Sequence, residues 1–320
     1  MGRVDFFIAG VQKGGTTALD HYLRDHPAIQ MASVKEVHAF DDETADWSVP
    51  TYERLQGAFD WTIPGVIRGE ATPIYSYWPN ALERLRDYNP QARLILLLRH
   101  PSFRAHSHWR METTRGNDTW PFADAIGATG RARVATSPGG AHRVFSYVER
   151  GFYAPQLRLA FSLFPREQIL LCRTDRLWSD PAATLAAVQD FLGVPHQTLG
   201  EQRYVVPVMT WSPDPIARDI RATLDAIFTD DIRETAALSG LDLTDWLDPD
   251  YREPMAPADR GLPAARGVVD RGHRAARRFV VDPQVPNVED RCAHDASLRL
   301  RPRGGQSLPR ALRPTGFTRA

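Results

Sequence analysis

Lysine is almost absent from this sequence, which has two lysines, Lys13 and Lys35, against 37 arginines in 320 residues. Arginine-favouring codon usage is the simplest explanation of the imbalance, but it leaves the positions of the two lysines to be explained. Cysteine is equally scarce, with Cys172 in an apolar run and Cys292 near the end of the chain. This spacing indicates neither a metal site nor a disulfide framework, so we expect reduced thiols and a cytoplasmic protein.

Long hydrophobic runs are also missing. The longest, Leu94–Leu98, is far shorter than the ~20 apolar residues that a membrane-spanning helix needs. Residues Arg3–Gly10 lead directly into a glycine-rich motif, and we therefore expect no signal or transit peptide before the folded part. With 42% hydrophobic and 10% aromatic residues, the composition is typical of a globular protein.

The formal net charge of zero hides an asymmetry between the two parts of the chain. Residues 251–320 contain 14 arginines and seven acidic residues, a net charge of +7, so residues 1–250 carry −7. Arginine, proline and glycine dominate the basic part, and we predict a domain over 1–250 followed by a mostly disordered tail over 251–320. A solvated appendage is the favoured interpretation of this tail, and no nucleic-acid partner is expected. The oligomeric state is left open.

Short apolar runs alternate with amphipathic segments along the first 250 residues. This order predicts an α/β fold of the P-loop-like type, with three αβα layers and a central parallel sheet. A loop is expected at Gly130–Gly140, which is rich in glycine, serine and arginine. The predicted strands are Val4–Ala9, Val66–Ala71, Arg93–Leu98 and Gln168–Arg173, and the predicted helices are Thr16–His26, Asn80–Tyr88, Ser102–Arg115, Ala154–Phe164, Pro181–Leu192, Ile216–Phe228 and Asp231–Ser239.

A glycine-rich loop, Gly10–Thr17, separates the first predicted strand from the first predicted helix. Exposed backbone N–H groups at such a helix start favour an anion such as phosphate. The loop does not match the Walker A motif of ATPases, because Thr16 stands where that motif requires lysine. A P-loop kinase or NTPase therefore remains an alternative, but a disfavoured one.

A second candidate anion site follows the predicted strand Arg93–Leu98. Arg99 ends this strand, and Ser107 lies eight residues later on the next predicted helix. A guanidinium group holds phosphate through several donors, and a hydroxyl group can complete the contact. Since parallel strands place their carboxyl ends at one edge of the sheet, the two sites suggest one ligand with two separated phosphates.

These motifs together resemble sulfotransferases that use 3′-phosphoadenosine-5′-phosphosulfate (PAPS), and they are most similar to the carbohydrate branch typified by heparan sulfate N- and O-sulfotransferases. The resemblance covers roughly residues 4–250. Its matching stretches are KGGTTA at Lys13–Ala18, the pair Arg99 and Ser107, KEVHAFD at Lys35–Asp41, GEATPIY at Gly69–Tyr75, and the segment Gly151–Gly193 with its FPREQ turn.

The resemblance also implies roles for individual residues. Glu36 matches the catalytic glutamate and is the candidate general base, while Lys13 stabilises charge on the leaving phosphate and His38 assists. Lys35, Asp41 and Tyr75 are the candidate acceptor-binding residues, and for Asp41, as for His38, a supporting role behind the site is the alternative. No metal is required. The donor-binding residues implied by the resemblance are Lys13, Gly14, Gly15, Thr16, Thr17 and Ala18 for the phosphosulfate, and Arg99 and Ser107 for the 3′-phosphate.

The sequence departs from the family pattern in three places. Ala39 replaces a phenylalanine of the KExHFF run, and Ala71 replaces the lysine of GEKTP. A later basic-glycine loop is not clearly present, although Arg203 and Tyr204 lie in its region. The acceptor is expected to be a saccharide or a small metabolite with a hydroxyl group, or less favourably an amine. A nucleotide-binding protein without catalysis is the remaining alternative.

Overall fold

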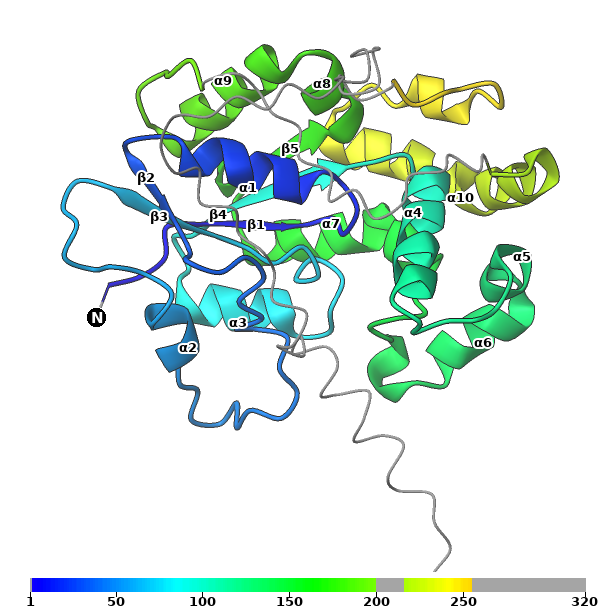
Figure 1. Cartoon of the computed structure of the whole chain (residues 1–320), viewed down its shortest axis with the longest axis horizontal. Helices are drawn as coiled ribbons and strands as arrows, with labels where there is room; N and C mark the ends of the chain where they lie inside the picture. The colour runs from blue at the N-terminus through cyan, green and yellow to red at the C-terminus, as the bar shows by residue number, and fades with distance from the viewer. Residues whose placement is uncertain (1, 200–215, 255–320) are drawn as a thin grey trace, which may run out of the picture. The chain divides into compact units, whose positions relative to one another are not determined.

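The computed structural model describes residues 2–199 and 216–254, which lie in one compact unit. Within these residues one parallel sheet forms the centre of the molecule, with strand order β2-β3-β1-β4-β5 (Figure 1). The α/β prediction with a central parallel sheet is confirmed. The strands are β1 (Phe6–Gly10), β2 (Ile29–Met31), β3 (Ile67–Ala71), β4 (Arg93–Leu98) and β5 (Ile169–Arg173).

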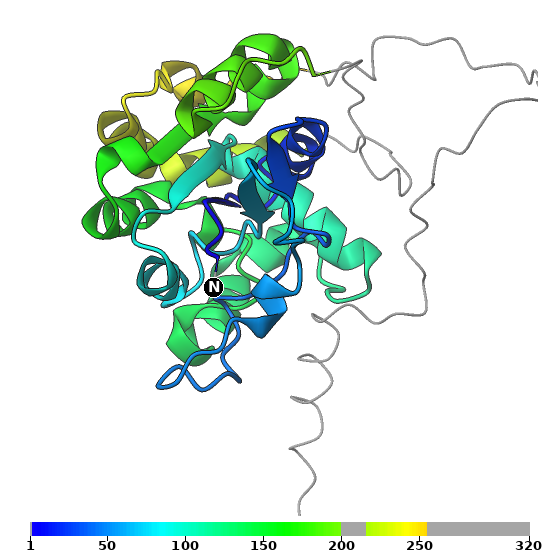
Figure 2. The ribbon, with the colours of Figure 1, turned by 90° about the vertical axis from the view of Figure 1, so that its left-hand side faces the viewer.

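Helices connect these strands and cover both faces of the sheet (Figures 1 and 2). The described helices are α1 (Thr16–Arg24), α2 (Glu53–Gln56), α3 (Ala81–Tyr88), α4 (Pro101–Thr114), α5 (Phe122–Ile126), α6 (Ala128–Ala135), α7 (Tyr153–Leu163), α8 (Thr174–Ser179), α9 (Pro181–Leu192) and α10 (Arg218–Ser239), with short 3-10 turns at Pro138–Gly140, Glu149–Gly151, Arg166–Gln168 and η4 (Thr244–Leu247).

Two hydrophobic cores form because the side chains of the buried strands point alternately to the two faces of the sheet. Successive strand residues point to opposite faces, so Phe6 and Ile8 of β1 pack in one core and Phe7 in the other. The first core contains the apolar sides of α1 and α9, and the second contains those of α3, α7 and α10. Because β1 and residues Leu94–Leu98 of β4 are buried, they are apolar on both faces, and the sequence shows them as short continuous apolar runs.

The order of the strands places a topological switch point at the carboxyl ends of β1 and β4. After β1 the chain moves to β2 and β3 on one side, and then crosses to β4 and β5 on the other. Ligands of open α/β sheets bind in the crevice that such a switch point creates. The glycine loop follows β1 and Arg99 follows β4, so both candidate anion sites lie at this switch point.

Two sequence predictions are wrong. Residues Ile216–Phe228 and Asp231–Ser239 were expected to form two helices, but α10 is continuous, because the intervening Thr229 and Asp230 do not interrupt the helix. The expected loop Gly130–Gly140 is largely α6. Its Gly130 is buried so closely against α5 that a Cβ atom would lie 2.1 Å from the Ala125 carbonyl oxygen.

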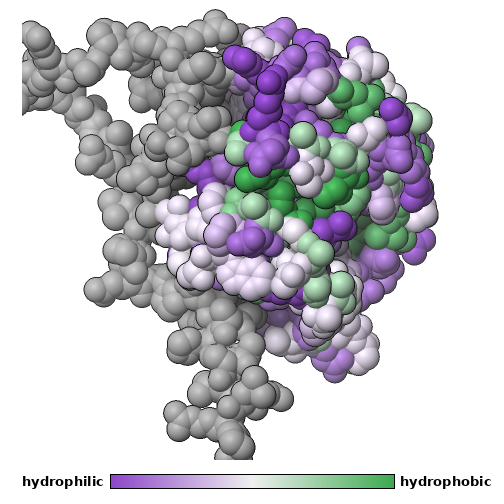
Figure 3. All heavy atoms as spheres, turned by 90° about the vertical axis from the view of Figure 1, so that its right-hand side faces the viewer, coloured by the Kyte–Doolittle hydropathy of each residue, from purple (hydrophilic) through white to green (hydrophobic). Residues whose placement is uncertain are grey.

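The described parts of the chain contain no helix that is long and apolar enough to cross a membrane. Figure 3 shows a mainly hydrophilic face with a smaller hydrophobic area near its centre. Cys172 is buried, and burial raises the pKa of its thiol to about 12, which makes it unreactive. Arg203, Tyr204, Cys292 and the predicted tail from residue 255 onward lie outside the described residues.

Candidate active site

The glycine loop between β1 and α1 depends on two glycines for its shape. A Cβ atom on Gly14 would lie 2.4 Å from the Leu97 carbonyl oxygen, so no larger residue fits there without a shift of the backbone. Gly15 is the N-cap of α1 and has a left-handed φ of 88°, which glycine adopts without strain. The first N–H groups of α1 have no partners within the helix and carry its positive dipole end, so they favour an anion.

Neighbouring strands fix the glycine loop in place. The Val11 N–H donates to the Leu97 carbonyl at 3.2 Å, and the Thr174 hydroxyl at the end of β5 donates to the Gly14 carbonyl at 2.7 Å. Arg99 Nη1 donates to the Lys13 carbonyl at 3.1 Å. The structure therefore brings together the glycine loop and Arg99, as the sequence predicted from their strand ends.

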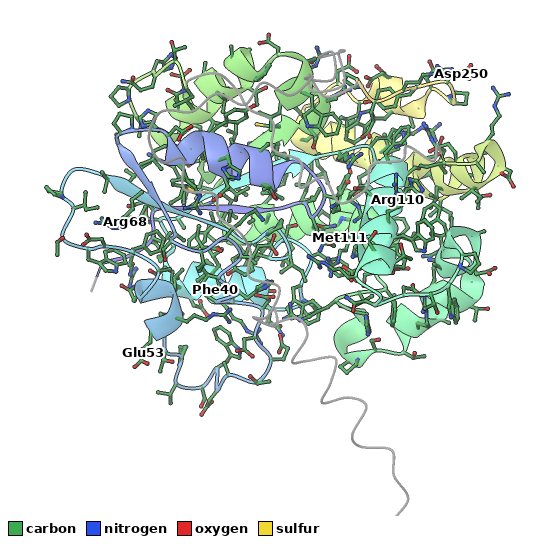
Figure 4. The ribbon with its side chains drawn as sticks, viewed as in Figure 1. Phe40, Glu53, Arg68, Arg110, Met111 and Asp250 are labelled. Atoms are coloured by element: carbon green, nitrogen blue, oxygen red, sulfur yellow. The ribbon has the colours of Figure 1, made fainter. Side chains whose placement is uncertain are left out.

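Lys13 lies near two guanidinium groups and two carboxylates. Its Nζ donates a weak hydrogen bond to Met111 Sδ of α4 at 3.7 Å (Met111 is labelled in Figure 4). Burial, followed by the guanidinium groups of Arg99 and Arg115, lowers the pKa of Lys13 to about 8, although the carboxylates of Glu36 and Glu112 raise it. A cation close to two guanidinium groups provides a favourable place for an anion.

Arg99 already holds a carboxylate. Its Nε and Nη2 atoms donate to the two carboxylate oxygens of Glu253 at 2.7 and 2.6 Å, and its guanidinium group lies 5.2 Å from the ring centroid of Trp178. Ser107 lies half-buried on α4, and its hydroxyl group makes no hydrogen bond with another described residue. Arg99 therefore binds an anionic group in this structure, whereas phosphate binding by Arg99 and Ser107 stays a prediction.

The loop Glu36–Ala39 is held by the segment Glu70–Tyr75, which begins with the last two residues of β3. Four consecutive backbone N–H groups of the loop donate to this segment. The bonds are Glu36 N to the Ala71 carbonyl at 3.0 Å, Val37 N to Glu70 Oε1 at 3.0 Å, His38 N to Thr72 Oγ1 at 3.3 Å, and Ala39 N to the Tyr75 hydroxyl oxygen at 2.8 Å. The motifs KEVHAFD and GEATPIY are therefore one structural unit, although some thirty residues separate them.

Backbone strain marks the candidate catalytic residues. Among the described non-glycine residues, positive φ angles occur at Lys13 (67°), Glu36 (62°), His38 (55°) and Asn80 (63°). Three of these four residues are the ones that the sequence analysis proposes as catalytic. Left-handed conformations of ordinary residues persist where the surrounding structure enforces them, which is common at functional sites.

Glu36 lies between Lys35 and His38. Lys35 Nζ donates to Glu36 Oε1, and His38 Nε2 lies 3.8 Å from Glu36 Oε2. Burial raises the pKa of Glu36, but Lys35, His38 and Arg115 together outweigh this effect and hold the pKa below its ordinary value. The Glu36 carboxylate is therefore ionised at neutral pH, and its side chain is 37% exposed, so it can accept a proton.

His38, Asp41 and Arg143 form a chain of contacts behind Glu36. His38 Nδ1 lies 2.8 Å from Asp41 Oδ2, and Arg143 Nη1 donates to the same oxygen at 2.6 Å. Burial lowers the pKa of His38, but the hydrogen bond and charge of Asp41 raise it above its ordinary value. Burial raises the pKa of Asp41, yet His38 and Arg143 together lower it. The sequence analysis missed Arg143, because no local pattern distinguishes it from other arginines.

Two of the proposed acceptor-binding residues lie inside the protein. Asp41 and Tyr75 are both fully buried, so in this conformation neither presents a surface to an acceptor. Asp41 holds His38, and Tyr75 holds the Ala39 N–H. Lys35 is 20% exposed and pairs with Glu36. Asp41 and Tyr75 therefore support the loop that carries Glu36, and acceptor binding by these residues stays a prediction.

The fold and the site define a class of protein: an α/β protein with a central parallel sheet, whose glycine loop lies near an ionised glutamate. A family model described as "Sulfotransferase domain" matches residues 3–206, and the chain belongs to this family. The resemblance inferred from its motifs is thereby confirmed. Members of the family are sulfotransferases, and the roles of individual residues in this chain remain predictions.

Individual relatives agree with this family. Heparan sulfate glucosamine 3-O-sulfotransferase 6 of Mus musculus is 34% identical over 190 residues, which are 58% of this chain and 51% of the relative. The membrane-associated sulfotransferase kil1 of Dictyostelium discoideum is 25% identical over 297 residues, 69% of this chain and 62% of that protein. A solved sulfotransferase from Alicyclobacillus acidocaldarius superposes with a TM-score of 0.65 and 27% identity, covering 77% of this chain and 99% of that one. The chain thus spans about half the length of the 3-O-sulfotransferase.

Proposed function

We propose that this chain transfers a sulfuryl group from PAPS to a hydroxyl group of a saccharide or small-metabolite acceptor, with an amine as the less favoured acceptor. One observation carries the proposal: Lys13 follows β1, and the Glu36 N–H donates to Ala71 at the end of the adjacent strand β3, so both residues lie at the same edge of the sheet. An anion-binding cation and an ionised base therefore share one site. The saccharide class rests on the relative that acts on heparan sulfate glucosamine.

Donor binding is assigned to the switch point at the ends of β1 and β4. Lys13 and the N–H groups of Gly14–Ala18 would hold the phosphosulfate, with the hydroxyl groups of Thr16 and Thr17 as further donors. Arg99 and Ser107 would hold the 3′-phosphate. When bound, PAPS supplies an activated sulfuryl group on a phosphate leaving group.

Glu36 and Lys13 have different chemical roles in this proposal. Glu36 accepts the proton of the acceptor hydroxyl as a bond forms between that oxygen and sulfur. The bond between sulfur and the bridging phosphate oxygen breaks, and Lys13 stabilises the negative charge that develops on this oxygen. His38, oriented by Asp41, and Lys35 keep Glu36 ionised between turnovers. The residues of the site provide alignment and charge, as in phosphoryl transfer.

The test combines a binding and a product assay. Adenosine 3′,5′-bisphosphate, which carries both phosphates of the donor, should stabilise the protein against thermal unfolding by about 2.7 kcal/mol at a hundredfold excess over its Kd. ADP at the same concentration should stabilise it much less. Incubation with PAPS and a panel of saccharides, alcohols and amines should give a product heavier by one sulfuryl group.

Two outcomes would contradict the proposal. Magnesium-dependent ATP hydrolysis with no preference for adenosine 3′,5′-bisphosphate would favour a P-loop kinase or NTPase. Tight binding of adenosine 3′,5′-bisphosphate without transfer to any acceptor would favour a nucleotide-binding protein without catalysis. The cytoplasmic location stays a prediction, and fractionation of cells that express the protein would test it.

A further inference from the structure

The segment after α10 is anchored at the start of α4. Trp246 of η4 is buried, and the ring of Tyr251 stacks on His100 with a centroid distance of 5.2 Å and an interplanar angle of 15°. The Tyr251 hydroxyl donates to Asp175 at 3.1 Å, and Arg221 donates to the Tyr251 carbonyl at 3.3 Å. These contacts fix the backbone two residues before Glu253.

Glu253 contacts Arg99 in the manner of an anionic ligand. Both carboxylate oxygens accept from the Nε and Nη2 side of the guanidinium group, at 2.7 and 2.6 Å, in the two-point geometry that arginine also uses for phosphate. The pair is shielded from water, with side-chain exposures of 16% for Arg99 and 14% for Glu253. The match to the sulfotransferase family model ends at residue 206, so Glu253 lies outside the matched region.

We propose that Glu253 is an internal competitor of the nucleotide's 3′-phosphate for Arg99, and that it must leave the guanidinium group when the nucleotide binds. This inference rests on the proposed function, which assigns the 3′-phosphate to Arg99. A phosphate dianion placed beside the Glu253 carboxylate would be repelled, because the two like charges would share a poorly solvated site. Arg99 can therefore bind only one of the two anions at a time.

Such competition sets nucleotide affinity and favours product release. The apparent Kd of a ligand is its intrinsic Kd divided by the fraction of molecules in the competent state, here those in which Glu253 has left Arg99. Donor and product nucleotides both carry the 3′-phosphate, so the competition weakens the binding of both. A carboxylate that returns to Arg99 after transfer promotes release of the product, a step that limits turnover in many enzymes.

The test compares two ligands that differ only in the 3′-phosphate. Calorimetry on the full chain would give the Kd of adenosine 3′,5′-bisphosphate and of AMP for the wild type and for Glu253→Gln. The matched control is Asp250→Asn, which removes the same charge from an exposed carboxylate of the same segment, paired with Arg218 (Asp250 is labelled in Figure 4). We expect Glu253→Gln to bind the bisphosphate on the order of tenfold more tightly and AMP unchanged, and Asp250→Asn to change neither.

Each other result overturns the inference. If the wild type prefers the bisphosphate to AMP but Glu253→Gln binds it equally or more weakly, Glu253 does not compete with the 3′-phosphate and only this inference fails. Equal tightening in Asp250→Asn would show a general charge effect and would also reject it. If neither the wild type nor Glu253→Gln distinguishes the bisphosphate from AMP, the assignment of Arg99 to the 3′-phosphate fails, and the proposed function fails with it.

Discussion

The glycine loop and the Glu36–Ala39 loop face the same site, but they are built in different ways. Backbone geometry shapes the first: Gly14 and Gly15 allow the turn, and the contacts that hold it reach its backbone, from Leu97 of β4, the Thr174 hydroxyl and Arg99. A network of side chains supports the second, because Glu70, Thr72 and Tyr75 each accept one of its backbone N–H groups. Burial raises the pKa of Glu70 to about 7, so this network contains a carboxyl group that is partly neutral at physiological pH.

The comparison suggests a division of labour. A loop shaped by its backbone geometry presents several fixed N–H groups. Such a loop is suited to binding the same anionic group in every turnover. A loop held by side chains keeps one carboxylate in position, and cations on both sides set its protonation. Changes in the first loop should therefore affect nucleotide binding, and changes in the second should affect turnover.

The largest effect is expected for Glu36→Gln. This change removes the proton acceptor but keeps the side-chain size, so kcat should fall by roughly 10³-fold, within the range for loss of a general base. The Kd for adenosine 3′,5′-bisphosphate should stay within about twofold, since the glycine loop is untouched. Full turnover in this variant would show that another group takes the proton.

Glu53→Gln provides the matched control for this variant. Glu53 is exposed on α2, at the edge of the molecule in Figure 4, and the same change of charge there should leave kcat unaltered. A comparable loss of turnover in both variants would mean that the overall charge, and not the position of Glu36, matters.

The next effect concerns Gly14→Ala. The added methyl group would meet the Leu97 carbonyl oxygen, so the loop must shift, and we expect a loss of about 1–3 kcal/mol in the free energy of unfolding together with loss of nucleotide binding. Denaturant titration and calorimetry measure the two quantities.

Gly116→Ala separates crowding from backbone strain. Gly116 has a positive φ of 77° but no atom within 4 Å of an added Cβ, so this variant should cost about 1 kcal/mol and retain nucleotide binding. If Gly14→Ala bound the nucleotide as tightly as Gly116→Ala does, the glycine loop would not require the close backbone approach.

A pH effect is expected at Lys13. Because burial and the neighbouring guanidinium groups lower the pKa of Lys13 to about 8, the free protein carries a largely neutral amine above that pH. An anionic nucleotide favours the charged form, so binding above pH 8 must take up a proton, and affinity should fall by up to about tenfold per pH unit. Lys13→Arg, which stays charged, should remove this pH dependence. A pH-independent Kd in the wild type would contradict the low pKa.

The smallest effect is the contribution of His38 to stability. Asp41 raises the pKa of His38 above its ordinary value, so the stabilising contact is fully present below pH ~6.5 and is lost as the pH rises through the pKa in the folded protein. The free energy of unfolding of the wild type should therefore exceed that of His38→Gln by more at pH 6 than at pH 9. An equal difference at both values would show that His38 is not charged in the folded state.

The sequence predicted those helices and strands whose pattern lies in neighbouring residues. The runs Arg93–Leu98 and Pro181–Leu192 match β4 and α9. The hydrophobic run of a buried strand and the capping residues of a helix are both visible in consecutive residues. Sequence reasoning failed where packing decided the outcome. Gly130 suggests a loop in sequence, yet it lies inside α6, where α5 approaches too closely for a side chain.

The same distinction holds at the site. The sequence identified Lys13, Glu36 and Arg99 through their motifs, and the two lysines of the chain lie at the glycine loop and beside the proposed base. It gave no sign of Arg143 or Glu253, since each reaches its partner across more than a hundred residues of chain.

The sequence by itself determined the family, the buried strands and the order of the motifs, because these depend on neighbouring residues. Only the tertiary structure decided that Asp41 and Tyr75 lie buried behind the loop of Glu36 rather than in front of it, and that Glu253 lies on Arg99. The physical reason is that burial and charge pairing depend on distances in space. Those distances are set when the sheet brings the ends of β1, β3, β4 and β5 to one edge.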